Sequence, residues 1–471
     1  MTDENQILES AHASGAAHAP TCASTQALAS THTDAHTDVY GSAHAFGRFR
    51  RTAISAGLAV RQSTRQTFHS LSNRNYRLFF IGQTISNTGN WLTNVALVLL
   101  VLNLTGSGLA VGMLTACQYG PVLFLSPWAG AIADHTDKRR MLMLTQSLEM
   151  GQSFGLAILA FMPHPPLPAL YALALIGGAL LAFDNPFRRS FVTEMVPPAH
   201  IANAVVLNST IVNVSRIFGP ALAGLLVITV GYGWCFTLDA LSYVAVLIAL
   251  AMMRPAELYR RAPKPRGKGE VRAGLRYIAT LPQLWISFAM LAAIGTLAYN
   301  FNVTLPLFVT DALHSSEATY TVLYSVFSFG AVVCALVVAN KSLVRIRHII
   351  VGAAAMGIAM VALALTPGVP AALVAVFFVG VASILYMTAT TALIQIEARP
   401  DMHGRVLSLQ TVLIGGTNLI GGPICGALAD AAGGRAPLVL GGVVCLVAAG
   451  VGLAATRRYV AGGWLGGEGG M

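Results

Sequence analysis

The sequence predicts an all-α polytopic membrane protein with twelve transmembrane helices in two pseudo-symmetric halves of six. Composition, a series of apolar segments and the placement of basic residues support this fold class. Of the 471 residues, 55% are hydrophobic and only 10% are charged, whereas a soluble domain carries about 25% charged residues. One membrane helix needs about 20 apolar residues, so the apolar residues suffice for about twelve spans. This composition excludes a soluble globular protein, a disordered chain and a typical nucleic-acid binder.

Apolar segments of helix length follow one another along the chain. The expected spans are residues 78–102, 109–133, 141–162, 167–187, 204–229, 234–253, 284–309, 319–340, 349–366, 370–394, 405–429 and 436–455. Residues 1–77 precede them. The first 47 of these contain no Lys or Arg, and their Ala/Ser/Thr-rich composition predicts disorder, whereas residues 48–77 carry seven arginines.

The basic residues predict the orientation of the chain. If the N-terminus is cytoplasmic, the inner segments hold 27 of the 29 Lys and Arg residues, while Arg435 falls in an outer loop and Arg216 inside a span. Such asymmetry is the positive-inside signal of membrane proteins. We therefore expect both termini in the cytoplasm. The net charge of +10 follows from this topology and does not indicate affinity for nucleic acid.

The spans divide into two halves that echo each other. The longest inner connection, residues 254–283, separates residues 78–253 from residues 284–455, and a tail covers residues 456–471. Two six-helix halves in parallel repeat are the architecture of major facilitator transporters, in which the substrate binds between the halves near the membrane midplane.

A Gly-Pro motif occurs in the fifth span of each half. Gly219-Pro220 and Gly422-Pro423 lie 203 positions apart, and the glycines Gly224 and Gly426 follow them. Because proline removes a backbone hydrogen bond, each motif is expected to bend its helix. Helix packing through small residues is the alternative interpretation.

The turn between the second and third spans carries a candidate gating latch. Its sequence, Gly130-Ala-Ile-Ala-Asp134-His-Thr-Asp137-Lys138-Arg139-Arg140, resembles the major facilitator signature G-x-x-x-D-[RK]-x-[GD]-[RK]-[RK]-[RK], with His135 at a usually basic position. The glycine lets a neighbouring helix approach, a carboxylate is favoured at a helix N-terminus, and arginines can pair with acids to hold the cytoplasmic side shut. An ordinary turn with positive-inside charges is the alternative.

A narrower resemblance extends over residues 73–455. The stretches that carry it are Asn87-Thr-Gly-Asn-Trp91, Leu104-Thr-Gly-Ser107, Asp184-Asn-Pro-Phe-Arg188-Arg189, Glu194-Met-Val-Pro197, Ala202-Asn-Ala204 and Phe236-Thr-Leu-Asp239-Ala-Leu-Ser242. They resemble the bacterial transmembrane secretion effector family, a branch of the major facilitators that includes enterobactin exporters and is akin to drug:proton antiporters. The resemblance implies a protein of the bacterial inner membrane that exports small organic molecules, driven by the proton gradient. In the fifth span, Ser215 to Gly224 resembles the antiporter motif G-x-x-x-G-P-x-x-G-G, with Ser215 and Ala223 replacing two glycines.

Charged residues within the spans are the candidates for proton coupling: Glu149, Arg216, Asp239 and Asp184. A charge at the centre of a membrane helix costs roughly 2.5–3.5 kcal/mol, so it normally faces a partner or a wet cavity. Glu149 and Arg216 both lie deep in their spans and could approach each other. Pairing would make them a structural ion pair, whereas an unpaired Glu149 facing the cavity would suit proton exchange. Asp239 and Asp184 lie nearer to span ends, where anchoring roles are more common.

Polar residues of spans one, seven and ten are the candidates for substrate contact. Those of span one, Gln83, Asn87, Asn90 and Asn94, share one helix face by their spacing. The others are Thr296, Tyr299 and Asn300 of span seven and Tyr386 of span ten. In the superfamily these spans line the cavity, and hydrogen bonding between helices is the alternative role. Because this set contains no fixed charge, it favours a neutral or amphipathic substrate.

No motif supports an enzyme, because the chain contains no phosphate-binding loop, no H-E-x-x-H and no G-x-S-x-G. We expect no cofactor and no metal site, with the proton gradient as the energy source. The leading hypothesis is a secondary active exporter that works by alternating access. Its expected partners are a small-molecule substrate, protons and the lipid bilayer, without nucleic acid, and it is expected to act as a monomer. The alternatives are an importer or facilitator of a nutrient and a non-transporting membrane sensor or scaffold.

Overall fold

The computed structural model describes residues 69–259, 270–338, 345–399 and 402–461. These residues fold into helices joined by turns, and none of them forms a strand. The predicted tail of residues 1–47 and the arginine-rich residues up to position 68 lie outside the described residues, as do residues 462–471.

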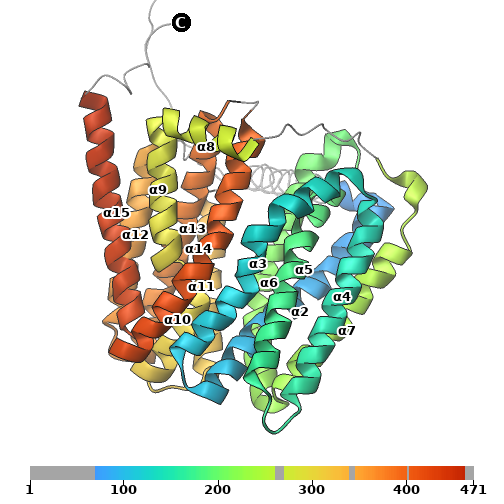
Figure 1. Ribbon diagram of the computed structural model, residues 1–471, viewed down its shortest axis with the longest axis horizontal. Helices are drawn as coiled ribbons and strands as arrows, with labels where there is room; N and C mark the ends of the chain where they lie inside the picture. The colour runs from blue at the N-terminus through green and yellow to red at the C-terminus, as the bar shows by residue number, and fades with distance from the viewer. Residues whose placement is uncertain (1–68, 260–269, 339–344, 400–401, 462–471) are drawn as a thin grey trace, which may run out of the picture. The chain divides into compact units, whose positions relative to one another are not determined.

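Six long helices form the N-terminal half (Figure 1). They are α2 (Arg74–Thr105), α3 (Gly108–His135), α4 (Lys138–Ala160), α5 (Leu167–Val192), α6 (Ile201–Thr229) and α7 (Tyr232–Ala251). Short 3-10 turns precede α2, α6 and the connection to the next half: η1 (His69–Ser72), η2 (Pro198–His200) and η3 (Pro255–Glu257). Each long helix corresponds to one predicted apolar segment, because runs of apolar residues can bury themselves in lipid or against one another as helices.

The described part of the C-terminal half contains six segments long and apolar enough to cross a membrane, one of them interrupted. Its elements are α8 (Glu270–Thr280), α9 (Pro282–Leu297), α10 (Phe301–Leu307), the π-helical η4 (Phe308–Ala312), α11 (Glu317–Val338), α12 (Ile346–Ala364), α13 (Val369–Glu397), α14 (His403–Ala432) and α15 (Ala436–Ala461). The predicted span 284–309 was expected to be one helix, but it is broken between α9 and α10 at residues 298–300.

The break between α9 and α10 is stabilised by a side chain. The Asn300 amide nitrogen donates to the backbone oxygen of Thr296 at 2.6 Å, which satisfies a carbonyl near the end of α9. Non-helical backbone is tolerated at membrane depth where it lies inside protein rather than against lipid. Asn300 is 2% exposed, so this condition is met.

A helix that the sequence analysis did not predict, α8, forms within the 254–283 connection. Its few apolar residues form one face, too short for a span, so it gave no signal of a membrane helix. Ile278 packs with Leu284 of α9 and Ile394 of α13. The Tyr277 hydroxyl accepts a hydrogen bond from the Arg399 backbone nitrogen at 3.0 Å. The helix therefore lies across the ends of the C-terminal spans (Figure 1).

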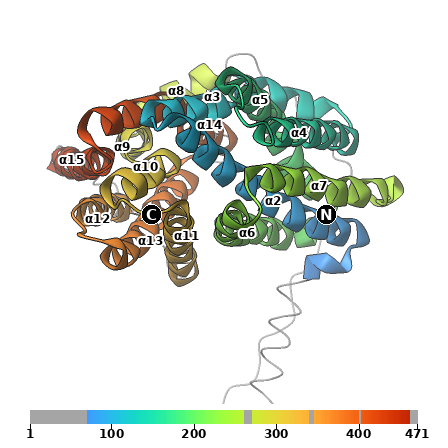
Figure 2. The same ribbon diagram turned by 90° about the horizontal axis from the view of Figure 1, so that it is seen from below.

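By length and composition, 11 segments of the described chain can cross a membrane. The predicted span that falls short is α4, since its 23 residues include Glu149, two glutamines and three basic residues at the start. It nevertheless packs between α5 and α7 in the N-terminal half (Figure 2). The count of twelve spans therefore stays a prediction, while the all-helical multi-pass architecture is confirmed.

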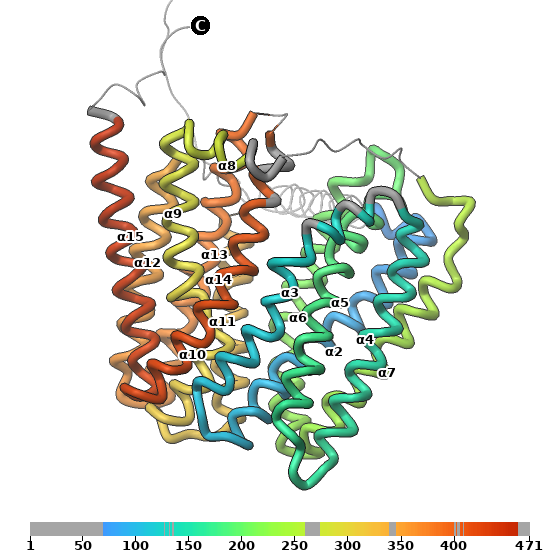
Figure 3. The backbone as a smooth tube through the Cα atoms, viewed as in Figure 1, coloured from blue at the N-terminus to red at the C-terminus, as the bar shows by residue number. Residues whose placement is uncertain are grey.

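The two halves meet where α3 crosses α14 (Figure 3). Glycines make this crossing possible. A Cβ atom added to Gly426 would lie 2.1 Å from the backbone oxygen of Gly108, and one added to Gly112 would lie 2.4 Å from that of Gly422. Glycine has no Cβ, so the two backbones touch directly.

The matching glycines of the N-terminal half also lie at helix crossings. A Cβ on Gly219 would meet Trp91 of α2 at 2.4 Å, and one on Gly224 would meet Thr321 of α11 at 2.0 Å. Both α6 and α14 continue through their prolines, Pro220 and Pro423, without ending. The structure thus places both Gly-Pro motifs where helices pack closely.

Candidate transport site

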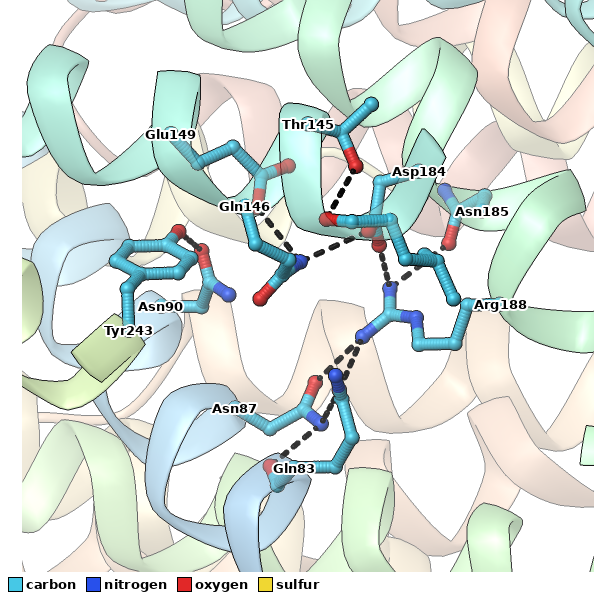
Figure 4. Close-up of polar contacts among 11 residues, drawn as sticks. Gln83, Asn87, Asn90, Thr145, Gln146, Glu149, Asp184, Asn185, Arg188 and Tyr243 are labelled. Carbon is cyan, nitrogen blue, oxygen red and sulfur yellow. Dashed lines mark hydrogen bonds and ion pairs between the residues drawn. The ribbon is translucent and has the colours of Figure 1, made fainter. Parts of the chain in front are cut away.

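A buried polar cluster lies inside the N-terminal half, where α2, α4 and α5 meet (Figure 4). Arg188 of α5 is at its centre, with its guanidinium 3.1 Å from the Asp184 carboxylate one turn earlier. The same guanidinium donates to Gln83 and Asn87 of α2 at 3.1 and 3.2 Å and to Asn185 at 3.1 Å. Two of the predicted substrate contacts, Gln83 and Asn87, therefore hold this arginine in place.

The second carboxylate of this cluster, Glu149, approaches from α4. The amide nitrogen of Gln146 donates to Glu149 at 3.0 Å and to Asp184 at 2.8 Å. Glu149 is 6% exposed and Asp184 is 1% exposed, so two carboxylates share one amide group away from bulk solvent. Arg188 pairs with Asp184, and the described residues form no ion pair with Glu149.

The structure does not bring Glu149 and Arg216 together. Arg216 lies midway along α6, and its guanidinium carbon is 5.8 Å from the centre of the Trp91 ring and 5.5 Å from that of the Phe327 ring. Of the two arrangements that the sequence left open, an ion pair between these residues is not formed. Sequence spacing placed both at mid-depth, but only the packing decides which way each helix turns its side chain.

Asp239 of α7 has hydroxyl partners instead of a cation. It is 1% exposed and accepts hydrogen bonds from Thr93 at 2.8 Å and Ser153 at 2.7 Å. A Cβ on Gly89 would lie 2.5 Å from an Asp239 carboxylate oxygen. The absence of a side chain at this glycine therefore lets α2 pack directly against the helix that carries the carboxylate.

The remaining amides of the span-one stripe, Asn90 and Asn94, lie further along α2 and contact tyrosines. The Asn90 side chain accepts a hydrogen bond from the Tyr243 hydroxyl at 2.9 Å (Figure 4), and its residue is exposed. Asn94 is half-buried and lies near the Tyr119 hydroxyl. Two amides of the stripe therefore contact Arg188 and the other two contact tyrosines, although the spacing placed all four on one helix face.

Most of the predicted substrate contacts from the C-terminal half form hydrogen bonds to backbone oxygens within that half. The Tyr299 hydroxyl donates to the backbone oxygen of Ser383 at 2.9 Å, and the Thr296 hydroxyl donates to the backbone oxygen of Ala292 at 2.7 Å. Tyr386 is fully buried, and its hydroxyl has no hydrogen-bond partner among the described residues. In this conformation Tyr386 is part of the helix core.

The predicted latch makes its described contacts inside the N-terminal half. Asp137 accepts from the Arg140 backbone nitrogen at 3.1 Å and so caps α4. Lys138 forms an ion pair with Glu194, and Arg139 donates to the backbone oxygen of Leu250 at 2.7 Å. Gly130 lies on α3. The side chains of Asp134 and His135 lie outside the described ones.

Contacts between the halves that the sequence analysis missed gather at the opposite end, where residues 106–107 join α2 to α3. Asp430 of α14 accepts from the backbone nitrogens of Gly108 and Leu109 at 2.5 and 2.9 Å and from the Ser107 hydroxyl at 2.7 Å. A carboxylate of one half thereby caps the first turn of a helix in the other half. No sequence signal identifies such a cap, because its two partners lie more than 300 residues apart.

Glu317 adds a second contact at this end. It begins α11 and accepts hydrogen bonds from Asn103 of α2 at 3.2 Å and from the Tyr232 hydroxyl of α7 at 2.6 Å. Acidic residues from the C-terminal half, Glu317 and Asp430, thus join the ends of three helices of the N-terminal half.

Comparison with known proteins places this geometry in a family. The sequence profile of the transmembrane secretion effector family matches residues 65–460. The chain is 24% identical over 264 residues to the staphyloferrin A transporter of Staphylococcus aureus, a match that covers 55% of this chain and 66% of that protein, slightly less than two thirds. It is 25% identical over 388 residues to the multidrug efflux pump Tap of Mycolicibacterium fortuitum, covering 78% of this chain and 94% of the pump.

A solved structure has the same fold. The crystal structure of a bacterial homologue of the human lysosomal transporter Spinster, in an inward-facing and unoccupied conformation, superimposes with a TM-score of 0.68 at 16% identity. The superposition covers 82% of this chain and 97% of the homologue. The family profile extends over both halves, as the sequence resemblance predicted. The chain therefore belongs to the transmembrane secretion effector family of major facilitator transporters.

Proposed function

We propose that this membrane transporter exports small organic molecules in exchange for protons, by alternating access between its two halves. Similarity to a multidrug efflux pump over most of both chains supports the direction of transport. The distribution of Lys and Arg supports insertion in the bacterial inner membrane with both termini in the cytoplasm. One chain supplies both halves that enclose the site, so a monomer suffices for transport.

The charge balance of the buried cluster is the observation that carries the proton-coupling proposal. Glu149 and Asp184 are both buried, and Arg188 is the cation that contacts the cluster. With both carboxyls ionised, these three groups carry a net charge of −1 away from water, which is costly in a medium of low dielectric constant. One proton removes that charge. Since Asp184 is paired with the arginine, the proton belongs on Glu149.

Movement of the two halves would let the proton on Glu149 exchange with water on one side of the membrane and then on the other. Asp430 and Glu317 hold the halves together at the end that joins α2 to α3, which the positive-inside distribution assigns to the outside of the cell. Opening this end requires these hydrogen bonds to break. Each opening and closing changes the access of the polar cluster to water, as alternating access requires.

The test begins with a substrate. Drug and metabolite susceptibility profiles of deletion and overexpression strains identify transported compounds and the direction of transport. The compound with the largest shift is then followed in inverted membrane vesicles with an imposed pH gradient. We expect accumulation in wild-type vesicles, and Glu149→Gln, which cannot exchange a proton, should reduce it to the level of vesicles without the protein.

Glu257→Gln is the matched control. This glutamate is exposed and pairs with Arg254 at the surface, so the same chemical change should leave transport unaltered. Unchanged proton-driven transport in Glu149→Gln would refute the coupling role. Uptake into cells, instead of export, would favour the importer hypothesis.

A further inference from the structure

Arg216 is a charged residue to which the proposed transport cycle assigns no role. It lies near the middle of α6, a helix apolar enough to cross the membrane. A charge at such a depth costs roughly 2.5–3.5 kcal/mol, so unpaired examples mark functional sites. Its guanidinium is not part of the polar cluster, which Arg188 already supplies with a cation.

The described residues provide Arg216 with aromatic rings and no carboxylate. It makes no ion pair among them, and its Nε atom is buried without a hydrogen-bond acceptor. The rings of Trp91 and Phe327 lie 5.8 and 5.5 Å from its guanidinium carbon. Ring faces stabilise a cation but accept few of its hydrogen bonds, and the Tyr324 hydroxyl beside the guanidinium offers one oxygen for several N–H donors.

Arg435 provides the contrast within the same chain. Its guanidinium also lies over an aromatic ring, Phe308, at 5.9 Å. However, it donates to the backbone oxygens of Ala364 at 2.5 Å and Ala312 at 3.5 Å. Arg435 therefore has a structural role at a helix end, while Arg216 has similar ring contacts without such acceptors.

The surroundings of Arg216 are planar and neutral. The ring of Tyr324 lies 6.2 Å from that of Trp91, and its hydroxyl donates to the Asn302 side chain at 2.9 Å. Aromatic faces with tyrosine hydroxyls and amides suit the planar body of a ligand, whose charge would then meet the arginine.

Residues from both halves meet at this arginine. Trp91 belongs to α2 and Arg216 to α6, both in the N-terminal half, whereas Phe327 and Tyr324 belong to α11. Nearby, the Ser325 hydroxyl of α11 lies 3.4 Å from the backbone oxygen of Ile217, so the two halves are in contact at this depth. A ligand here touches both moving parts, as the substrate of an alternating-access transporter must.

We infer that Arg216 is the anion-binding group of the substrate site, and that the transported molecules carry a carboxylate or similar delocalised anion on an aromatic body. This inference rests on the proposed function as a transporter. It revises the expectation of a neutral or amphipathic substrate, which rested on the lack of a fixed charge among the polar residues of spans one, seven and ten. A guanidinium binds a carboxylate through two parallel hydrogen bonds, which selects for both charge and planarity.

Three ligands that differ in charge but share one ring system test the inference. These are 2-naphthoate, 2-naphthamide and 2-naphthylmethylammonium, titrated into the purified full-length protein in detergent. We expect wild-type protein to bind the naphthoate about tenfold more tightly than the amide, the scale of one charge-assisted hydrogen bond. The ammonium compound should bind most weakly.

Variants separate a binding role from a structural one. Arg216→Gln should abolish the preference for naphthoate over naphthamide, and Arg216→Lys should keep part of it, since lysine retains the charge but not the planar fork. Arg435→Gln is the matched control and should retain the full preference. Thermal unfolding of each variant verifies that it is folded.

Equal binding of naphthoate and naphthamide to the wild type, a preference that survives Arg216→Gln, or no binding of naphthoate at millimolar concentration would each overturn the inference. Glu149→Gln should keep the charge preference, because the polar cluster is separate from Arg216. Failure of proton coupling in vesicles and failure of anion selectivity in the binding assay are therefore distinguishable results.

Discussion

The two halves of this transporter share a helical plan but differ in the chemistry of their interiors. The N-terminal half buries charged residues at Glu149, Asp184 and Asp239, and Arg188 links Asp184 to the amides of α2. In the described part of the C-terminal half, charged residues lie near helix ends. Its buried polar residues are neutral and include Ser287, Asn300, Thr304, Ser328, Ser383, Tyr386 and Thr390.

The pseudo-symmetry alone would give both halves the same role. The different buried residues instead suggest that the N-terminal half exchanges protons and that the C-terminal half provides aromatic surfaces and contacts between the halves. Both halves carry a Gly-Pro motif at a close helix crossing, so in both halves glycine lets helices come into close contact. Among the described residues, only the N-terminal half combines that packing with carboxylates buried inside its spans, the groups to which we assign proton exchange. The C-terminal half contributes aromatic surfaces and the carboxylates that join the halves at one end.

The largest effect on stability and transport is expected when Arg188 is removed. In Arg188→Ala, Asp184 and its neighbours lose their cation while remaining buried, and breaking a buried pair in this way typically costs about 3–5 kcal/mol. We expect a matching fall in the free energy of unfolding and a complete loss of transport. Arg188→Lys should recover part of the stability but little transport, because one ammonium cannot reproduce the forked contacts to α2.

Thermal unfolding in detergent and vesicle transport measure the Arg188 variants. An unfolding temperature of Arg188→Ala equal to that of the wild type would mean that the carboxyls are already neutral without the arginine. The proposed net charge of −1 for ionised Glu149 and Asp184 together with Arg188 would then be wrong.

A smaller effect is expected for Asp239→Asn. The asparagine keeps one acceptor oxygen, and the hydroxyls of Thr93 and Ser153 can reverse and accept from its new amide protons. We expect a loss of about 1 kcal/mol in the free energy of unfolding, with transport retained. Asp239→Leu, which has no polar atom, provides the contrast and should lose clearly more stability. If Asp239→Asn abolishes pH-driven transport, Asp239 shares the proton-coupling role with Glu149.

The smallest effect is expected in the C-terminal half, at Tyr386→Phe. The hydroxyl is buried without a partner in the described structure, so its removal deletes no hydrogen bond and should leave the free energy of unfolding equal or slightly higher. Tyr299→Phe is the matched control, because it does remove a hydrogen bond, the one to Ser383. Its expected cost is about 1 kcal/mol. A large loss of transport in Tyr386→Phe would make this hydroxyl a substrate contact in another conformation.

Local sequence patterns predicted the spans well but not their interruptions. Eleven segments of the described chain are long and apolar enough to cross a membrane. The sequence could predict them because hydropathy is a property of consecutive residues. The break at residues 298–300 was missed, since Ala298 and Tyr299 are as compatible with a helix as their neighbours. What stabilises the break is the Asn300 side chain on the Thr296 carbonyl, and this contact has no signature in composition.

The candidate site was predicted in its residue types more than in its arrangement. Glu149, Asp184 and Arg216 were identified because charges are rare inside spans. Their partners depend on which helices pack together. Hence Asp184 and Glu149, expected to have separate roles, share Gln146, while Glu149 and Arg216, expected at similar depth, form no pair.

By itself, the sequence determined that this chain is a multi-pass helical membrane protein, because apolar segments and biased basic residues act through lipid and membrane charge alone. Its motifs added the resemblance to the major facilitators. The tertiary structure decided which buried charges meet. Arg188 is enclosed by amides and a carboxylate, and Arg216 lies between aromatic rings of both halves. The physical reason is that the role of a buried charge depends on its partners on neighbouring helices, and spacing along one helix does not specify those partners.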